Sequence, residues 1–106
     1  MKRLTDNEVD FNLTTLKGWE LDEHESRIHK LFTFKNFKIA FEAMQRVAVV
    51  AEEIGHHPDW YNSYNKLNVK LSTHDAGGLT MLDFELAQRI EEIVADIKKK
   101  RPRMNS

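Results

Sequence analysis

Histidines are the residues of this sequence best suited to acid–base chemistry, and three of the five lie in two short segments. His56 and His57 are adjacent, and His74 lies between Thr73 and Asp75. Imidazole has an ordinary pKa of about 6.5, so it can give or take a proton near neutral pH. Both segments directly follow a predicted helix or strand, where loops commonly present catalytic groups. Together they predict an acid–base site that needs no metal or cofactor.

The same residue types also fit metal-binding or purely structural roles. Three histidines could bind zinc, but the adjacent His56 and His57 should point in divergent directions, and the sequence has no cysteine to join them. Trp60 could be a core residue, and Asp83 could cap a helix that begins after Thr80. The glycines at 77 and 78 suit a turn, although glycine also lets a flat ligand approach the backbone. Residue types alone therefore favour a metal-free site and leave these alternatives open.

The first third of the chain predicts a helix followed by a hairpin. Thr5 and Glu8 have the spacing of a capping box, and Gly18 is expected to end the helix. Residues 19–22 and 28–34 alternate apolar and polar side chains as paired strands do. The alternation of the second strand is imperfect, because Lys30 falls on its apolar face.

A long helix is predicted from Asn36, its N-cap, to Gly55, its C-terminal cap. Its main apolar stripe is formed by residues at three- and four-residue steps, namely Phe37, Ala40, Phe41, Met44, Val47, Ala48 and Ala51. A second stripe contains Ile39, Ala43 and Val50, and we interpret it as a subunit interface. Packing under a loop explains that stripe equally well.

The last part of the chain predicts a second hairpin and a third helix. Residues 60–72 contain two strands with a turn or bulge at residues 64–66. The final helix starts after Thr80, with Asp83 as its capping partner. Its buried face contains Leu82, Leu86, Ile90, Ile93 and Ile97, and Pro102 is expected to stop it.

The predicted fold is therefore α+β, in the order α-β-β-α-β-β-α. Strands joined by short turns are antiparallel, and amphipathic helices need a sheet face to cover. We expect residues 1–106 to form one domain, with three helices on one face of a four-stranded antiparallel sheet.

Composition excludes several classes of protein. The chain has 106 residues, no cysteine and a formal net charge of −1, so disulfides, thiolate chemistry and a general attraction to nucleic acid or membranes are not expected. No secretory leader and no membrane span are predicted. We expect a cytoplasmic protein, with the nucleus as a second compartment. The basic residues 98–103 could serve nuclear import or nucleic-acid binding, but a solvated helix end explains them better.

Taken together, these segments resemble the pterin-4a-carbinolamine dehydratase family, which also acts in animals as a dimerisation cofactor of a homeodomain transcription factor. The resemblance covers nearly the whole chain. It depends most on three segments, which are Glu52-Glu53-Ile54-Gly55-His56-His57-Pro58-Asp59-Trp60, Leu71-Ser72-Thr73-His74-Asp75 and Gly78-Leu79-Thr80 with Asp83. A glutamate, Glu52, separated by three residues from His-His-Pro-x-Trp, with a later Thr-His-Asp, is a specific compound motif.

The resemblance implies a dehydratase that removes water from a 4a-hydroxytetrahydropterin without a cofactor and so supports aromatic amino-acid hydroxylases. It places His56, His57, His74 and Asp83 in the catalytic site. We expect His56 and His74 to transfer protons, His57 to hold the substrate, and Asp83 to orient a histidine or meet the pterin.

The resemblance further implies substrate contacts for a second set of residues, namely Glu52, Trp60, Asp75 and Gly78. The expected partners are the small pterin substrate and further copies of the chain, in a homodimer or homotetramer formed through the second helix and the sheet. The alternative function is a non-catalytic module that stabilises a transcription-factor dimer through a helical contact.

Overall fold

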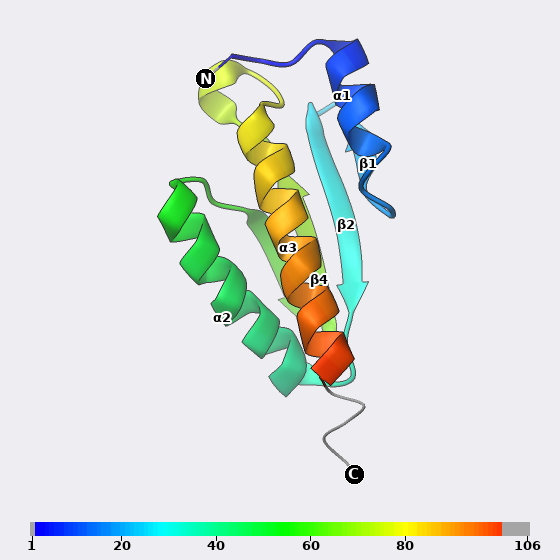
Figure 1. Ribbon diagram of the computed structural model, residues 1–106, viewed down its shortest axis with the longest axis vertical. Coiled ribbons are helices and arrows are strands. Elements are labelled where there is room, and N and C mark those ends of the chain that lie inside the picture. Colours follow the sequence, from blue (N-terminus) through cyan, green and yellow to red (C-terminus); the bar gives the residue numbers. More distant parts are fainter. Residues whose placement is uncertain (1, 101–106) are drawn as a thin grey trace.

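The computed structural model describes residues 2–100 and has helices on one side of a twisted sheet (Figure 1). The four strands are β1 (Glu20–Asp22), β2 (Arg27–Thr33), β3 (Asp59–Ser63) and β4 (Lys66–Leu71). The helices are α1 (Asp6–Leu13), α2 (Phe37–Ile54), the short 3₁₀ helix η1 (His74–Ala76) and α3 (Met81–Lys100). The predicted α+β order of three α-helices and four strands is confirmed.

All strand pairs are antiparallel, in the order β1-β2-β4-β3. Two of the pairs are the predicted hairpins, β1–β2 and β3–β4, and Tyr64 has the positive φ of 51° that the tight β3–β4 turn requires. β4 inserts between β2 and β3, with Ile28 opposite Leu71 and Trp60 opposite Val69. α2 therefore crosses over the sheet from β2 to the far edge strand.

The core lies between the sheet and the helix layer. Alternate residues of the two central strands are buried under the helices, namely Ile28, Phe32, Leu67, Val69 and Leu71. Lys30 points to the same face, and its Nζ lies 2.6 Å from Glu91 Oε2 on α3 and 4.9 Å from the centroid of the Phe32 ring. This ion pair explains why a lysine interrupts the apolar face of β2.

One face of α3 is buried, as predicted. Leu86, Ile90, Ile93 and Ile97 are buried, and Leu82 is half-buried. The expected stop at Pro102 lies outside the described residues. None of the helices within residues 2–100 is long and apolar enough to cross a membrane.

The apolar surface of α2 is divided differently from the prediction. Ile39, Ala43 and Val50 are buried in the core, so their assignment to a subunit interface is wrong. The exposed part of the apolar surface lies on the other edge of α2. There the rings of Phe37 and Phe41 stack, with their centroids 5.9 Å apart, and Ala48 is exposed further along the helix. The sequence showed that α2 has excess apolar surface, but not which edge the sheet and α3 cover.

The start of α1 agrees with the prediction and its end does not. Thr5 and Glu8 form the capping box, and hydrogen bonds from Thr5, above all from its backbone N–H, hold the pKa of Glu8 below its ordinary value. The helix ends at Leu13 rather than near Gly18. The hydroxyls of Thr14 and Thr15 donate to the backbone carbonyls of Phe11 and Asn12, at 2.6 and 3.0 Å. These side-chain hydrogen bonds serve carbonyls at the end of the helix, so the helix can stop there.

Two valines of α2 offer a matched test of the core. The Val47 side chain is buried, with 1% of the residue exposed, whereas Val49 is 60% exposed. Val47→Ala should lower the free energy of unfolding by about 2 kcal/mol, because it removes buried methyl groups and leaves a cavity. Val49→Ala makes the same chemical change and should stay within about 0.5 kcal/mol of the wild type. Urea titrations measure both values, and equal effects would show that this part of α2 does not pack as described.

Candidate active site

The site begins where three elements meet. α2 and α3 run side by side in opposite directions, so the end of α2, the start of α3 and η1 lie together at one end of the helix layer (Figure 1). Gly55 ends α2 in the left-handed conformation, with φ of 67°. The backbone N–H groups of Gly55 and His56 both donate to the carbonyl of Ala51. This C-terminal cap fixes the direction in which His56 leaves the helix.

His56 contacts Asp83 at this junction. Its Nε2 lies 2.6 Å from Oδ1 of Asp83, which is in the first turn of α3. The His56 side chain is 11% exposed and the Asp83 side chain is fully buried. A carboxyl group suits the N-terminus of a helix, so the backbone N–H groups at the start of α3 favour Asp83 at this position.

Asp83 is held by two threonines as well. Its Oδ2 accepts hydrogen bonds from the Thr80 backbone N–H at 3.0 Å and from the Thr73 hydroxyl at 2.8 Å. The two threonine hydroxyls also lie 2.8 Å apart. The predicted capping contact from Asp83 back to Thr80 is confirmed, but the Thr80 hydroxyl accepts from the Leu82 N–H rather than from that of Asp83. Asp83 therefore caps α3 and anchors His56 at the same time.

Thr73 connects the second histidine segment to this anchor. The backbones of Thr73 and Gly78 form an antiparallel bridge that closes the η1 loop, which carries His74 and Asp75. Because the Thr73 hydroxyl reaches Asp83, the loop of His74 is fastened to the carboxylate that holds His56. His74 and Asp75 are exposed, and their roles toward a substrate stay predictions.

His57 forms a second, exposed contact. Its Nε2 lies 2.5 Å from Oε2 of Glu52, one turn back on α2. The two side chains are 62% and 77% exposed, so a ligand can reach both. Their predicted substrate roles are compatible with this exposure and stay predictions.

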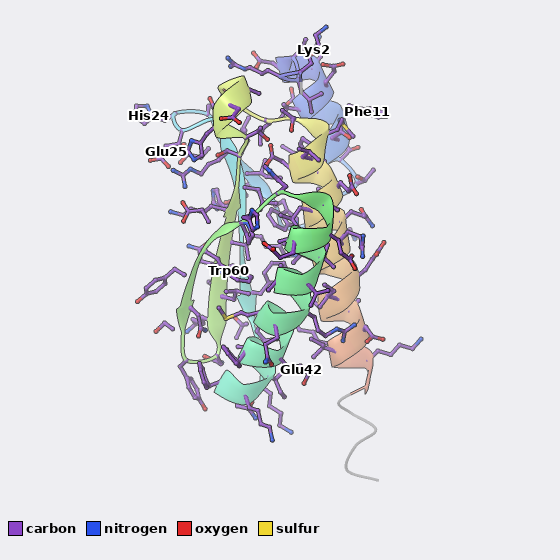
Figure 2. All side chains as sticks on the ribbon, turned by 90° about the vertical axis from the view of Figure 1, so that its left-hand side faces the viewer. Lys2, Phe11, His24, Glu25, Glu42 and Trp60 are labelled. Atoms are coloured by element: carbon purple, nitrogen blue, oxygen red, sulfur yellow. The ribbon has the colours of Figure 1, made fainter. Side chains whose placement is uncertain are left out.

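Trp60 and Gly78 have structural surroundings that their sequence motifs did not reveal. Trp60 is half-buried and packs against the core, between the β3–β4 hairpin and α2 (Figure 2). Gly78 is buried, and a Cβ there would lie 2.8 Å from Nε of Arg3, so the glycine makes room for that side chain. The predicted substrate contacts of Trp60 and Gly78 stay predictions beside these packing roles.

Sequence reasoning missed the Thr73 hydroxyl. Thr73 precedes His74 directly, but nothing in that spacing signals a contact with Asp83, ten residues further along the chain. Within residues 2–100, no group of three or more histidine and acidic side chains is arranged to hold a metal ion. The contacts His56–Asp83 and His57–Glu52 are two separate pairs.

The chain belongs to the pterin 4 alpha carbinolamine dehydratase family, whose sequence model matches residues 2–93. The matched range contains His56, His57 and His74.

Curated relatives cover most of the chain. A protein of Rhizobium johnstonii named "Putative pterin-4-alpha-carbinolamine dehydratase" is 48% identical over 95 residues, which is 90% of this chain and 94% of the relative. A protein of the same name from Chelativorans is 44% identical over 94 residues, 89% of this chain and 96% of the relative.

Two solved structures share the fold. A transcriptional coactivator/pterin dehydratase from Brucella melitensis is 39% identical, with a TM-score of 0.85 over 87% of this chain and 98% of that chain. A pterin dehydratase-like RuBisCO assembly factor of the alpha-carboxysome is 18% identical, with a TM-score of 0.63 over 72% of this chain and 88% of that chain, and shows similarity of fold alone.

The cap that aims His56 can be tested at Gly55. A Cβ at this position would meet nothing within 4 Å, so the cost of a substitution comes from the left-handed backbone alone. Gly55→Ala should destabilise the protein by about 1 kcal/mol, and Gly55→Asn by less, because asparagine tolerates this conformation better. Thermal unfolding measures the order of the three proteins, and an alanine variant as stable as the wild type would contradict the cap.

Proposed function

We propose that this protein is a 4a-hydroxytetrahydropterin dehydratase, a hydro-lyase that yields quinonoid dihydropterin and water. The observation that carries the proposal is the buried Asp83 carboxylate on Nε2 of His56, next to the loop of His74. Buried carboxylate–histidine pairs orient an imidazole for proton transfer. The family membership supplies the substrate class.

The reaction needs one acid and one base. The C4a–O bond breaks as hydroxide leaves, and a proton delivered to that oxygen turns it into water. N5 loses its proton, and the electron pair of the N5–H bond forms the C4a=N5 double bond. One proton is given and one is taken, so the protein returns to its starting charge and no electron is transferred.

The histidines are assigned to these steps by their surroundings. His56 and His74 transfer the two protons, His56 from a fixed position and His74 from the exposed η1 loop. His57 with Glu52 is exposed on the neighbouring turn and contacts the substrate ring or its hydroxyl. Asp83 acts through His56. In this role the protein recycles the pterin that aromatic amino-acid hydroxylases release.

Replacement of the proton-transfer histidines tests the proposal directly. His56→Ala and His74→Ala should each lower kcat about 10²–10⁴-fold, because each removes one proton-transfer group. Formation of quinonoid dihydropterin from freshly generated carbinolamine is followed optically.

A histidine outside the site, His29, provides the control. His29 lies on β2, where its neighbours Ile28 and Lys30 point toward the helices, so His29 faces the other side of the sheet. His29→Ala should retain a kcat within about twofold of the wild type. Wild-type rates in both His56→Ala and His74→Ala would contradict the acid–base assignment.

A binding role is the second candidate function, because α2 exposes apolar surface. Phe37 and Phe41 are each nearly half exposed and stack on each other. The similar protein from Brucella melitensis is described as a transcriptional coactivator as well as a pterin dehydratase. We propose that this face of α2 packs against a second copy of the chain, since two adjacent exposed phenylalanines favour burial in a self-complementary contact.

The oligomeric state in solution tests this contact. Phe37→Ser with Phe41→Ser should lower the mass measured by light scattering by at least half, because the contact loses its aromatic surface. Phe11→Ser changes a still more exposed phenylalanine on α1 and should leave the mass unchanged. A monomeric wild type would contradict self-association and favour a helical partner of another kind.

A further inference from the structure

We propose that Thr73 is a positioning residue that orients the Asp83 carboxylate, which in turn fixes the tautomer of His56, so that Nδ1 of His56 is the nitrogen that exchanges protons with the substrate. This inference deepens the proposed dehydratase function and rests on it. It follows from counting the protons in the hydrogen bonds around Asp83.

The counting begins at Asp83. An ionised carboxylate only accepts hydrogen bonds, and Asp83 lies in the first turn of α3, where its Oδ2 accepts from the Thr80 backbone N–H. Thr73 must therefore use its single hydroxyl proton on Oδ2 of Asp83. The contact between the two threonine hydroxyls then has only one possible direction, because Thr73 has no proton left and Thr80 must donate.

The hydrogen bonds consequently form one directed chain. The Leu82 N–H donates to the Thr80 hydroxyl at 3.2 Å, Thr80 donates to Thr73, and Thr73 donates to Asp83. Each donor polarises the next, so the last hydrogen bond in the chain is strengthened. The chain starts at the N-terminus of α3 and ends on the carboxylate that faces His56.

The other carboxylate oxygen determines the state of His56. Oδ1 of Asp83 can only accept, so Nε2 of His56 carries a proton. A neutral imidazole has a single N–H, which leaves Nδ1 with a free lone pair. When His56 gains a proton, it gains it at Nδ1. Nε2 faces a fully buried carboxylate, so Nδ1 is the nitrogen left to serve a substrate.

The hydrogen bond from Thr73 to Asp83 can be removed by a substitution. Of the two hydrogen bonds to Oδ2, the one from Thr80 comes from the backbone, which a substitution does not remove. Without the Thr73 hydroxyl, Oδ2 loses a donor, and the carboxylate and the His56 ring are less well oriented. Hydrogen bonds to charged groups contribute about 1.5–3 kcal/mol, which corresponds to about 10- to 100-fold in rate when the contact acts on the transition state.

A pair of isosteric and conservative variants tests the inference. Thr73→Val removes the hydroxyl and keeps the shape, so kcat should fall about 10- to 100-fold while KM stays within about twofold. Thr73→Ser keeps the hydroxyl and should restore kcat to within about threefold of the wild type. Thr33→Val removes an exposed hydroxyl from the end of β2 and should leave kcat unchanged.

The tautomer is read independently of activity. Long-range ¹⁵N–¹H NMR spectra at about pH 8, where an ordinary imidazole is neutral, should show His56 protonated at Nε2 in the wild type and also in Thr73→Val, because Oδ1 of Asp83 still accepts from Nε2. His56→Gln identifies the signals by removing them. A wild-type His56 protonated at Nδ1 would overturn the inference, as would an unchanged kcat in Thr73→Val.

The two proposals fail in distinguishable ways. If the wild type does not turn over the carbinolamine, the dehydratase function fails, and the wild-type tautomer still decides the position of the proton. If Thr73→Val does not fold, the wild-type spectrum and the kcat of Thr73→Ser decide the inference. A Thr73→Ser variant as slow as the histidine variants would count against it.

Discussion

A buried carboxylate organises this site. Asp83 lies in the first turn of α3 without solvent contact, and its two oxygens are shared among a helix start, a loop and a histidine from another helix. A buried polar group is costly unless it is hydrogen-bonded, and these partners meet both oxygens of the buried carboxyl group. The same contacts therefore stabilise the start of α3 and bring the His56 and His74 segments together.

The packing of α2 against α3 makes that arrangement possible. The two helices are in contact, and both bury small side chains completely, Ala40 and Ala43 on α2 and Ala87 on α3. Because the helices are antiparallel, their close packing puts the end of one beside the start of the other. His56 then needs only the left-handed turn at Gly55 to reach Asp83.

Much of this organisation could be predicted from local sequence signals. Capping residues such as Thr5 and Asn36 act within one turn of their helices, so their effect is visible in the sequence. The early end of α1 was missed because threonine hydroxyls compete for carbonyls in a way that Gly18 did not suggest. The division of the apolar surface of α2 was missed because it depends on how the helix is rotated against the sheet. The motif identified the histidines, whereas Thr73 became visible only through a contact ten residues away in the chain.

Burial, rather than pairing, separates the roles proposed for the two adjacent histidines. Both His56 and His57 have a carboxylate within hydrogen-bond distance of Nε2. The pair of His57 and Glu52 is exposed, so water screens it and competes for both partners, and the ring can turn toward a ligand at little cost. The pair of His56 and Asp83 is enclosed and supported by further donors, so its geometry is set before any ligand arrives. Preorganisation of this kind matters most for a group that moves a proton in the transition state, and adaptability matters most for a group that binds.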